Sequence, residues 1–385
     1  MLACVIAAAA VAWWALTRLG FARIVGAIVA CAFLAGAVTL IVLEGSLLAN
    51  VLIVAAALLS IAAARRVFAV VPAELPIVAP PQRPVLFYNP KSGGGKAERF
   101  HVAREASARG VKPIELHFSD DLEALVRAEI DGGADAVGVA GGDGTQAIVA
   151  AVAADRGVPY VCVPAGTRNH FALDLGVDRN DVVGALDAFT NGRQRLVDLA
   201  EVNGRVFVNN VSLGVYAEAV QTEGYRDAKI RTIADTVPLA IGPDEQPLDL
   251  QWTGADGQHH DTAAIVLVSN GSYRLGRVLA SGTRPRLDAG VLGITVATRG
   301  AGERRRPVAA WSASTFEVSS GVPIAAGIDG EAAMLDSPLR FESRPAALRV
   351  LIAPQHPGAS PSATMPAGRW DAIRAIARVA IHGTT

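Results

Sequence analysis

Gly141-Gly142-Asp143-Gly144-Thr145 is the stretch that decides the fold of this chain. It directly follows Ala136–Ala140, an apolar run with the length of a buried strand, and it leads into a helical pattern at Thr145–Ala154. Glycine lets backbone N–H groups approach phosphate oxygens, and a helix N-terminus adds partial positive charge. The stretch therefore predicts a phosphate-binding loop between a strand and a helix.

Two further glycine-containing loops have the same setting. Asn89–Gly95 (NPKSGGG) follows the apolar run Val85–Tyr88, and Pro164–Phe171 (PAGTRNHF) follows Tyr160–Val163. A single Gly-Gly pair would indicate only a turn, but three such loops in this order are typical of a nucleotide site. We therefore expect the three loops to act together.

The segments between these loops alternate between strand and helix patterns. Helices are expected over Lys96–Arg109, ended by Gly110, and from an N-cap at Ser119 to about Ile130, with a strand at Ile114–Phe118 between them. This alternation predicts a parallel α/β sheet, whose ligands bind at the carboxyl ends of the strands. All three loops fall at such ends.

The polar residues of the loops indicate what they bind. Asp143 is the only acid in its loop, and it could orient a nucleotide or hold Mg²⁺ directly or through water. Thr145 offers a hydroxyl at the start of a helix. The third loop supplies a second Gly-Thr pair, Gly166-Thr167, and the amide of Asn169.

From about Arg195 to Pro354 the pattern changes to short strands separated by turns rich in Gly, Pro, Asp and Asn. We expect an antiparallel sandwich or barrel here, including a hairpin with a type I′ turn at Asn203-Gly204. Strands are expected at 197–202, 206–211, 264–269, 291–296, 315–318, 339–342 and 348–352. The interval Gly224–Gln251 is irregular and could form a lid or a lipid-facing segment.

A turn with two carboxylates stands out in this second region. Asp329 and Glu331 flank Gly330, directly after the apolar run Val322–Ala326 and Gly327-Ile328. Read alone, Asp-Gly-Glu is most often a solvated hairpin. Beside three phosphate loops it predicts the base, or the orienting carboxylate, that a kinase acting on an alcohol needs near the acceptor hydroxyl.

The N-terminus carries three charge-free stretches, Met1–Thr17, Ile24–Leu43 and Gly45–Ala64. A bilayer core requires roughly 20 apolar residues in a helix, so the second and third fit and the first is short. We expect two or three transmembrane helices; the first segment could instead lie at the interface. A signal peptide is disfavoured because no basic region precedes the first apolar run.

Arginine pairs set the expected orientation of these helices. Arg18 and Arg23 follow the first stretch, and Arg65 and Arg66 follow the third, whereas Glu44 lies between the second and third. The excess of positive charge on cytoplasmic loops then predicts that everything after Arg66 is cytoplasmic and that the protein is a multi-pass protein of the cell membrane.

The segments beyond the expected domains are rich in proline or in small residues. Val71–Pro84 predicts an extended linker, Pro354–Gly368 a flexible one, and Arg369–His382 a basic amphipathic helix that lies on the bilayer or docks on the protein. The expected organisation is a transmembrane region at 1–66, a linker at 67–84, an α/β domain at 85–194, a β-rich domain at 195–354, and a linker with the C-terminal helix at 355–385.

Composition excludes some functions. The net charge of −1 over 385 residues gives no reason to expect nucleic acid as a partner. The three cysteines, Cys4, Cys31 and Cys162, form no Cys/His metal spacing and no disulfide framework. The oligomeric state stays open, because small-residue helices can pack within one chain or between chains.

Taken together, these motifs resemble the lipid kinases with a diacylglycerol-kinase-type catalytic domain, a group that includes sphingosine and ceramide kinases. The resemblance covers about Pro84 to Pro354, and its carriers are NPKSGGG at 89–95, GGDGT at 141–145, PAGTRNHFA at 164–172, FVNNVSLGVYAE at 207–218, SNGSYRLGRVLASGTRPRLDAGVLGITV at 269–296 and IDGE at 328–331. It implies an α/β domain similar to phosphofructokinase and NAD kinase that binds ATP with Mg²⁺, followed by a β-rich domain with the lipid site. The expected reaction is phosphorylation of a membrane lipid hydroxyl, with diacylglycerol as the first choice and phosphatidic acid as product.

The resemblance also implies roles for single residues. Those implied to contact phosphates or the nucleotide are Asn89, Ser92, Gly93, Gly142, Asp143, Gly144, Thr145, Gly166 and Thr167. Asp329 matches the general base and Glu331 the acid that accompanies it. Asp288 matches an acidic position associated with a structural metal or with loop support, and so joins Asp143, the acid of the second loop, as a candidate metal-binding residue.

Two segments depart from the family pattern. The third loop reads Gly166-Thr167-Arg168-Asn169-His170-Phe171 where Gly-Thr-Gly-Asn-Asp-Phe is common, so Arg168 could reach phosphate and His170 replaces an acid. Arg284–Gly290 departs from the usual acid-acid-Gly ending. Three alternatives remain: a kinase of the NAD-kinase type with a soluble substrate, a non-catalytic membrane sensor of lipid or nucleotide, and a kinase for a sphingoid, isoprenoid or glycolipid acceptor.

Overall fold

The computed structural model describes residues 73–214, 248–274, 282–298 and 308–363, together with Ala7, Ala8, Val11, Ile28, Val29, Cys31 and Ala32 near the N-terminus. The described residues from 73 onward belong to one compact unit, and those before it to another. Within the described residues, no helix is long and apolar enough to cross a membrane. Apart from the seven N-terminal residues just named, the three stretches expected to span the bilayer lie outside the described residues, as does the expected C-terminal helix at 369–382.

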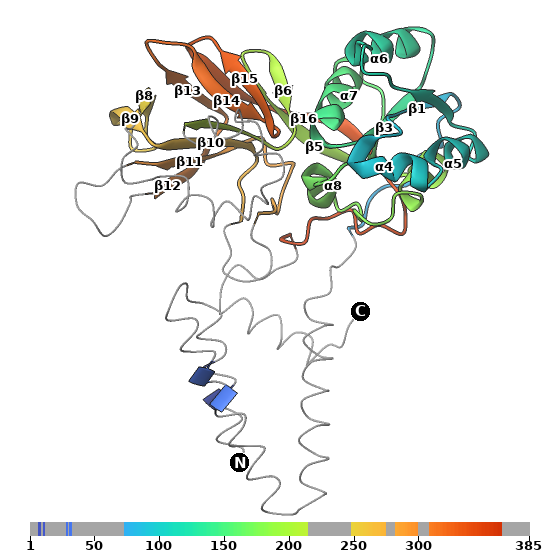
Figure 1. Cartoon of the computed structure of the whole chain (residues 1–385), viewed down its shortest axis with the longest axis horizontal. Coiled ribbons are helices and arrows are strands. Elements are labelled where there is room, and N and C mark those ends of the chain that lie inside the picture. The colour runs from blue at the N-terminus through green and yellow to red at the C-terminus, as the bar shows by residue number, and fades with distance from the viewer. Residues whose placement is uncertain are drawn as a thin grey trace, which may run out of the picture. The chain divides into compact units, whose positions relative to one another are not determined.

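The first half of the compact unit is a parallel α/β sheet. Its strands are β1 (Pro84–Tyr88), β2 (Lys112–Glu115), β3 (Ala136–Gly141) and β4 (Tyr160–Pro164), in the order β2-β1-β3-β4. The helices are α4 (Ser92–Arg99), α5 (Val102–Ala108), α6 (Leu122–Asp131), α7 (Asp143–Arg156) and α8 (His170–Leu175), followed by η1 (Gly184–Asp187) and α9 (Ala188–Asn191). Strands β3 and β4 are buried along their whole length, as expected for parallel strands covered on both faces. Figure 1 shows α4 to α8 around this sheet.

The second half is a β-rich sandwich. One sheet has the order β12-β11-β10-β7-β14-β15, and the facing strands β5, β6, β13, β8 and β9 continue the α/β sheet through β16. The bounds are β5 Arg193–Val202, β6 Arg205–Phe207, β7 Asn210–Gly214, β8 Leu248–Thr253, β9 His259–Ala263, β10 Ile265–Asn270, β11 Leu292–Ala297, β12 Val308–Ala313, β13 Thr315–Ser319, β14 Ile324–Ile328, β15 Glu331–Leu335 and β16 Leu339–Ile352. An apolar core that includes Phe207, Trp252, Phe316 and Phe341 lies in this half. The expected α/β region followed by a β-rich sandwich is confirmed.

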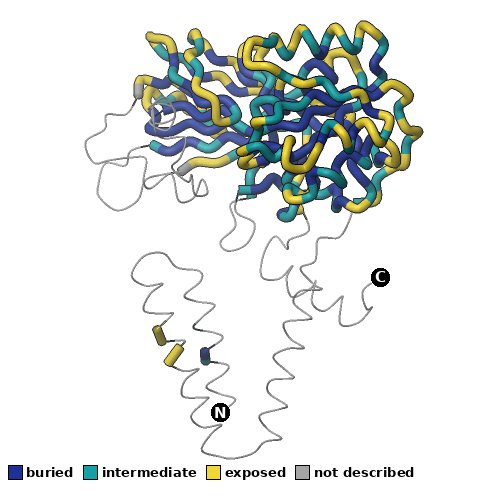
Figure 2. Tube along the Cα trace, turned by 45° about the vertical axis from the view of Figure 1, so that its right-hand side comes forward, coloured by how far each residue is buried: buried dark blue, intermediate teal, exposed yellow. Residues whose placement is uncertain are grey.

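Strand β16 joins the two halves. It pairs antiparallel with β5 and β13 and parallel with β4, so one sheet runs through the whole unit. Two separate strands were expected at 339–342 and 348–352; this was wrong, because a bulge between Arg344 and Leu348 lets a single strand continue. Figure 2 shows the buried residues concentrated along the strands and the exposed residues mainly on the surrounding segments. The domain limits near residues 194 and 354 stay predictions.

Several local expectations are confirmed and others are wrong. Asn203 and Gly204 have φ of 48° and 79°, as a type I′ turn requires. The helix expected over 96–109 is instead two helices, because the backbone breaks at His101, where φ is 50°. The expected N-cap Ser119 is wrong, since Asp121 accepts the hydrogen bond from the Ala124 amide at 3.0 Å.

The stretches that flank the expected domains lie against the fold where they are described. The Ala73 amide donates to Pro357 O at 2.8 Å, and Ile77 forms a β-bridge with Arg193. Ser360 and Ser362 are buried. The flexible linker expected from composition is therefore wrong for residues 354–363, because buried polar contacts hold this part in place.

We predict that Asp121→Ala lowers the free energy of unfolding by about 1 kcal/mol, because the first turn of α6 loses its capping acceptor. Ser119→Ala is the matched control and leaves stability unchanged. Chemical denaturation monitored by circular dichroism measures both variants. Equal losses in the two variants would contradict the cap assignment.

Candidate active site

The three glycine-rich loops pack against one another through their backbones. The Gly166 amide donates to Gly141 O at 3.0 Å, and Lys96 Nζ donates to Gly166 O at 3.3 Å. A Cβ on Gly166 would lie 2.3 Å from the Cα of Gly142, and a Cβ on Gly93 would lie 2.2 Å from Ala165 O. The loops can approach this closely only because side chains are missing at these contacts.

The first loop has a backbone that only glycine adopts easily. Gly93, Gly94 and Gly95 have φ of 56°, 71° and 80°, and the regular part of α4 follows them. Before them, Asn89 Oδ1 accepts from the Lys91 amide at 2.9 Å, and Asn89 O accepts from the Ser92 amide at 3.0 Å. These bonds fold the loop back over the end of β1.

Asp143 joins the second loop to the third. Its two carboxylate oxygens accept hydrogen bonds from the amides of His170 and Phe171, both at 3.0 Å, and so cap α8. From the sequence, Asp143 was expected to contact the nucleotide or Mg²⁺; its role as a cap of α8 was not expected. Each oxygen keeps capacity for a second interaction, so the carboxylate has the chemistry of a metal ligand even while it caps the helix.

The departure at His170 leaves this arrangement intact. The cap uses the backbone amide of residue 170, while the His170 side chain is exposed, so the replaced acid is not needed for the loop geometry. Asn169 holds the loop instead. It is buried, accepts from the Gly166 amide at 2.9 Å, and donates to Pro164 O at 3.1 Å and Gly166 O at 2.8 Å. Arg168 and Thr167 are exposed beside it.

Gln146 is a supporting residue that the sequence analysis missed. It is buried in the first turns of α7, and its side-chain amide donates to Val139 O at 3.1 Å, Gly141 O at 3.2 Å and Val163 O at 3.0 Å. The Tyr160 hydroxyl donates to its carbonyl oxygen. Gln146 thereby ties the ends of β3 and β4, from which two of the loops start. A polar residue directly after GGDGT was the available signal.

Asp329 is held by backbone amides of another segment. It lies in the turn between β14 and β15, and its carboxylate accepts from the amides of Val208 at 2.9 Å, Asn209 at 2.8 Å and Asn210 at 3.1 Å. The residue is half-buried and has a left-handed φ of 49°. The carboxylate is thus fixed before any ligand arrives.

Opposing influences act on the pKa of Asp329. The pKa is raised to about 7, chiefly by burial and with a smaller contribution from the nearby charge of Asp143, while the three amide hydrogen bonds act to lower it. An ordinary Asp has a pKa of about 3.9, so this carboxyl is one whose protonation changes near neutral pH. Such a pKa suits a group that accepts a proton and then releases it.

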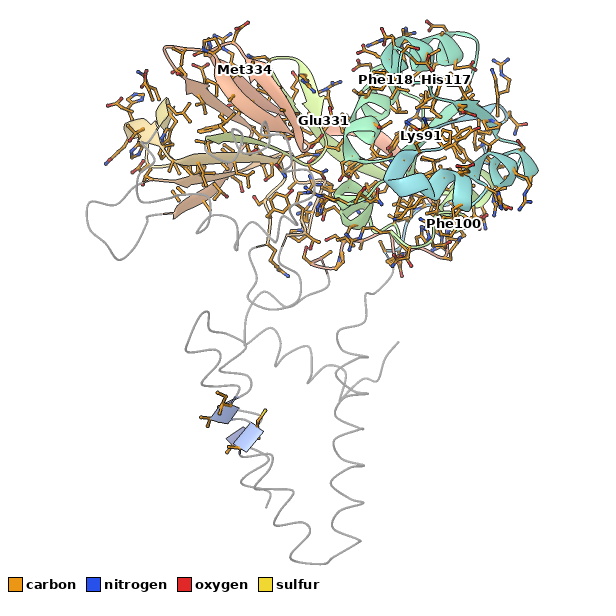
Figure 3. The ribbon with its side chains drawn as sticks, in the orientation of Figure 1. Lys91, Phe100, His117, Phe118, Glu331 and Met334 are labelled. Atoms are coloured by element: carbon orange, nitrogen blue, oxygen red, sulfur yellow. The ribbon has the colours of Figure 1, made fainter. Side chains whose placement is uncertain are left out.

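The Asp-Gly-Glu turn meets the second phosphate loop directly. A Cβ on Gly144 would lie 2.2 Å from Glu331 Oε1, so the Glu331 carboxylate lies against this glycine. Figure 3 shows Glu331 at the end of the β14–β15 hairpin, on the side facing α7. Glu331 and Gly144, which are far apart in the sequence, therefore lie side by side, and their joint role in one site stays a prediction.

A groove extends from this meeting point. Its volume is about 410 Å³, and Gly144, Asp329 and Glu331 line one part of it. Ala147, Ile148 and Ala151 of α7 form an apolar wall. The remaining lining is strongly polar and includes Glu123, Arg127, Asp155, Arg205 and Arg344. The groove thus has a carboxylate part, an apolar wall and several cationic side chains.

Asp288 lies apart from this groove. It is exposed and pairs with Arg286 at 3.0 Å, and it does not line the groove. Asp198 supports the same loop from beneath, accepting from the Gly290 amide at 2.6 Å and the Ala346 amide at 2.8 Å. Within the described residues no group of three or more His, Cys, Asp or Glu side chains could hold a metal. A metal role for Asp288 stays a prediction.

We predict that Gly166→Ala weakens ATP binding by about tenfold or more, because the new methyl group meets the backbone of Gly142 and separates the loops. Gly321→Ala is the control, since only Asp249 lies within 4 Å of a Cβ there, at 3.9 Å. Titration with a fluorescent ATP analogue measures both. Wild-type affinity in a folded Gly166→Ala protein would contradict the loop geometry.

Comparison with known proteins agrees with this site. Residues 83–202 match the family "Diacylglycerol kinase catalytic domain". The chain is 38% identical over 77 residues to a diacylglycerol kinase of Bacillus subtilis, covering 20% of this chain and 25% of the relative. It is 34% identical over 119 residues to a diacylglycerol kinase of Mycobacterium tuberculosis, covering 30% of this chain and 38% of the relative. The matches therefore span a quarter to two fifths of the length of these relatives.

A solved structure extends the likeness in fold. The crystal structure of a diacylglycerol kinase from Bacillus anthracis superposes with a TM-score of 0.54 at 22% identity, covering 71% of this chain and 98% of that chain. At this identity the superposition shows the fold, which includes both the α/β half and the β-rich half. Three glycine-rich loops, the Asp-Gly-Glu turn that meets them and these matches lead to one conclusion: residues 83–202 of this chain match the diacylglycerol kinase catalytic domain, and the fold around them is that of a diacylglycerol kinase.

Proposed function

We propose that this protein transfers the γ-phosphate of ATP to the hydroxyl group of a membrane lipid, with diacylglycerol as the acceptor and phosphatidic acid as the product. The observation that carries the proposal is the position of Asp329. A carboxylate with a pKa near 7 is held at the edge of a groove whose adjoining walls come from the phosphate loop and α7. The names of the matched relatives support diacylglycerol as the acceptor.

The loops would bind the triphosphate. The glycines at 93, 142 and 166 bring the backbones of the three loops together, and Lys96 Nζ lies beside the third loop, where it would contact a phosphate. The adenosine would then occupy the groove against the apolar wall of Ala147, Ile148 and Ala151. Arg205 lies in the same groove, where its guanidinium would contact a phosphate group of the nucleotide.

Mg²⁺ would enter with the nucleotide. It commonly binds through one or two carboxylates, phosphate oxygens and waters, so a dense cluster of protein ligands is not required. Asp143 is the acid of the phosphate loop and fits this need, directly or through water. When bound, the ion neutralises phosphate charge that builds up during transfer.

Asp329 would act on the acceptor. The lipid hydroxyl oxygen forms a bond to the γ-phosphorus, the bond from that phosphorus to the β-phosphate oxygen breaks, and the hydroxyl proton passes to the Asp329 carboxylate. ADP and the lipid phosphate leave. Glu331 lies against Gly144 and would keep the Asp-Gly-Glu turn aligned with the phosphate loop.

The N-terminal apolar stretches support a location at the membrane. Two of them have the length of a bilayer-spanning helix, and the arginine pairs favour a cytoplasmic catalytic region, where ATP is available. We therefore propose a multi-pass protein of the cell membrane whose active site takes its acceptor from the same bilayer.

The proposal is tested with radiolabelled ATP, Mg²⁺ and detergent-solubilised full-length protein, offered a panel of lipids and followed by extraction of the organic phase. Label on diacylglycerol is expected. Label on a sphingoid, isoprenoid or glycolipid acceptor instead would keep the mechanism and overturn the proposed substrate. ATP binding without label on any lipid would overturn the kinase assignment and favour a sensor.

We predict that Asp329→Asn lowers kcat by about 10²- to 10⁴-fold, the usual contribution of a general base, while ATP affinity changes little. Asn keeps the size of the side chain but cannot take the proton. Gly321→Ala serves again as the control, because Gly321 lies in the exposed loop before the same β14–β15 hairpin. Turnover near the wild-type rate in a folded Asp329→Asn protein would contradict the assignment of Asp329 as the general base.

We also predict an acid limb in the pH profile of kcat/KM with a midpoint near pH 7. The raised pKa of Asp329 means that its base form is lost as the pH falls through about 7. Initial rates measured from about pH 5 to pH 9 provide the test, since an unperturbed Asp would place the limb near pH 4. A profile that is flat across neutral pH contradicts the assignment.

A further inference from the structure

Arg284 is a fully buried arginine that none of the assigned roles uses. It lies in the segment before β11, its side chain has no exposed surface, and it pairs with Asp174, which is also buried. A buried guanidinium must satisfy its charge and its donors inside the protein. The hydrogen-bond and ion-pair partners of Arg284 therefore indicate its role.

Asp174 provides one half of those partners. Its carboxylate accepts from the Arg284 amide at 2.8 Å and from Arg284 Nε at 2.7 Å. Asp174 lies on α8, and the first amides of α8 are the ones that Asp143 caps. Arg284 is thus attached, through one short helix, to the acid of the phosphate loop.

The backbone beside Asp329 provides the other half. Arg284 Nη1 donates to Val208 O at 2.6 Å and to Asn270 O at 2.8 Å, and Nη2 donates to Asn209 Oδ1 at 2.9 Å. Val208 and Asn209 are two of the three residues whose amides hold the carboxylate of Asp329. Arg284 and Asp329 therefore form hydrogen bonds with the same segment, but with different atoms of it.

One peptide unit carries this link. The carbonyl of Val208 accepts from Arg284, and the N–H of the same peptide, which belongs to Asn209, donates to Asp329 Oδ1 at 2.8 Å. Carbonyl and N–H of a trans peptide point in opposite directions, so fixing one fixes the other. Bonds in such a chain also polarise one another, which strengthens the contact to the carboxylate.

We propose that Arg284 is a positioning residue for phosphoryl transfer, which aims the Val208–Asn209 peptide at Asp329 and links this carboxylate to the phosphate loop through Asp174 and α8. The proposal rests on the proposed function for its effect on turnover. Its structural part, the hold on the 208–210 segment, is independent of any substrate.

The principal test is Arg284→Lys in the full-length protein. Lysine keeps the positive charge but replaces the planar guanidinium by a single ammonium group. One ammonium cannot donate hydrogen bonds to all the acceptors of Arg284, which belong to Val208, Asn209, Asn270 and Asp174. Arg195→Lys is the matched control. Arg195 also bridges carbonyls, donating to Leu175 O at 3.3 Å and Gly358 O at 3.0 Å, and it touches the end of α8 without contacting the 208–210 segment.

Two readouts are measured on each protein. Hydrogen exchange followed by mass spectrometry reports the amides of the 207–211 segment, and steady-state kinetics separates kcat from KM for ATP. We expect Arg284→Lys to speed exchange in this segment and to lower kcat about tenfold or more, the size of one lost hydrogen bond to a charged group, with KM for ATP nearly unchanged. The control should alter neither.

Asp174→Asn is a second variant, which tests the same link if Arg284→Lys does not fold. It leaves the contacts of Arg284 to the peptide carbonyls available and removes only the partner charge, so the same changes are expected at smaller size. In the double variant the kcat loss should match that of Arg284→Lys alone, because both residues act through one link.

The outcomes separate cleanly. Unchanged exchange at 207–211 in both Arg284→Lys and Asp174→Asn overturns the proposal, and so does equal acceleration in the Arg195→Lys control. Faster exchange with wild-type kcat overturns the effect on transfer. If the wild-type protein labels no lipid, the proposed function fails, while the exchange measurement still decides whether Arg284 holds the segment.

Discussion

The pairing of β16 with strands of both halves is the constraint on which the candidate active site depends. Over Leu339–Ile352 this strand is antiparallel to β5 and β13 and parallel to β4. Since β4 leads into the third phosphate loop and β5 leads through β6 to the 208–210 segment, the pairing sets the distance between phosphate loops and Asp329 (Figure 1). A sheet interrupted at this point would leave the two halves of the site free to separate.

Within that frame, contacts between backbones do much of the positioning. Glycines 93, 142 and 166 allow three loops to touch, and Asp143 and Asn169 fix the loops by hydrogen bonds to main-chain groups. Asp329 is held in the same manner by three amides. Main-chain donors lose little entropy when they bind, so such a site is organised before its ligands arrive.

The parts that could be predicted from the sequence are those whose signal is local. The loop motifs, the Asn203-Gly204 turn and the Asp-Gly-Glu turn each combine a few adjacent residues with a definite backbone need, and the structure contains them. A joint role of Asp329 and Glu331 with the loops was inferred from their chemistry in combination; the structure places Glu331 against Gly144, and the role itself stays a prediction. The groove along α7 was not inferred, because it depends on how β6 and β16 pack against that helix.

Predictions from the sequence were wrong where neighbouring residues were equally suited to one role, or where contacts with residues distant in the sequence determine the local structure. Ser and Asp are both common at the N-cap position, so Ser119 and Asp121 were both candidates. Because α6 begins at Leu122, Asp121 is the residue that caps it. The proline-containing stretch at 354–363 looks like a linker until Ser360 and Ser362 are seen to be buried. Arg284 and Asp174 lie 110 positions apart, so their pairing could not be read from either segment.

The most direct test of the account is a structure of the full-length protein with Mg²⁺ and a non-hydrolysable ATP analogue. We predict the triphosphate across the loops at Gly93, Gly142 and Gly166, the adenosine against α7, and the γ-phosphate facing Asp329 with space for one hydroxyl group between them. A nucleotide bound elsewhere, or a γ-phosphate directed away from Asp329, would contradict it.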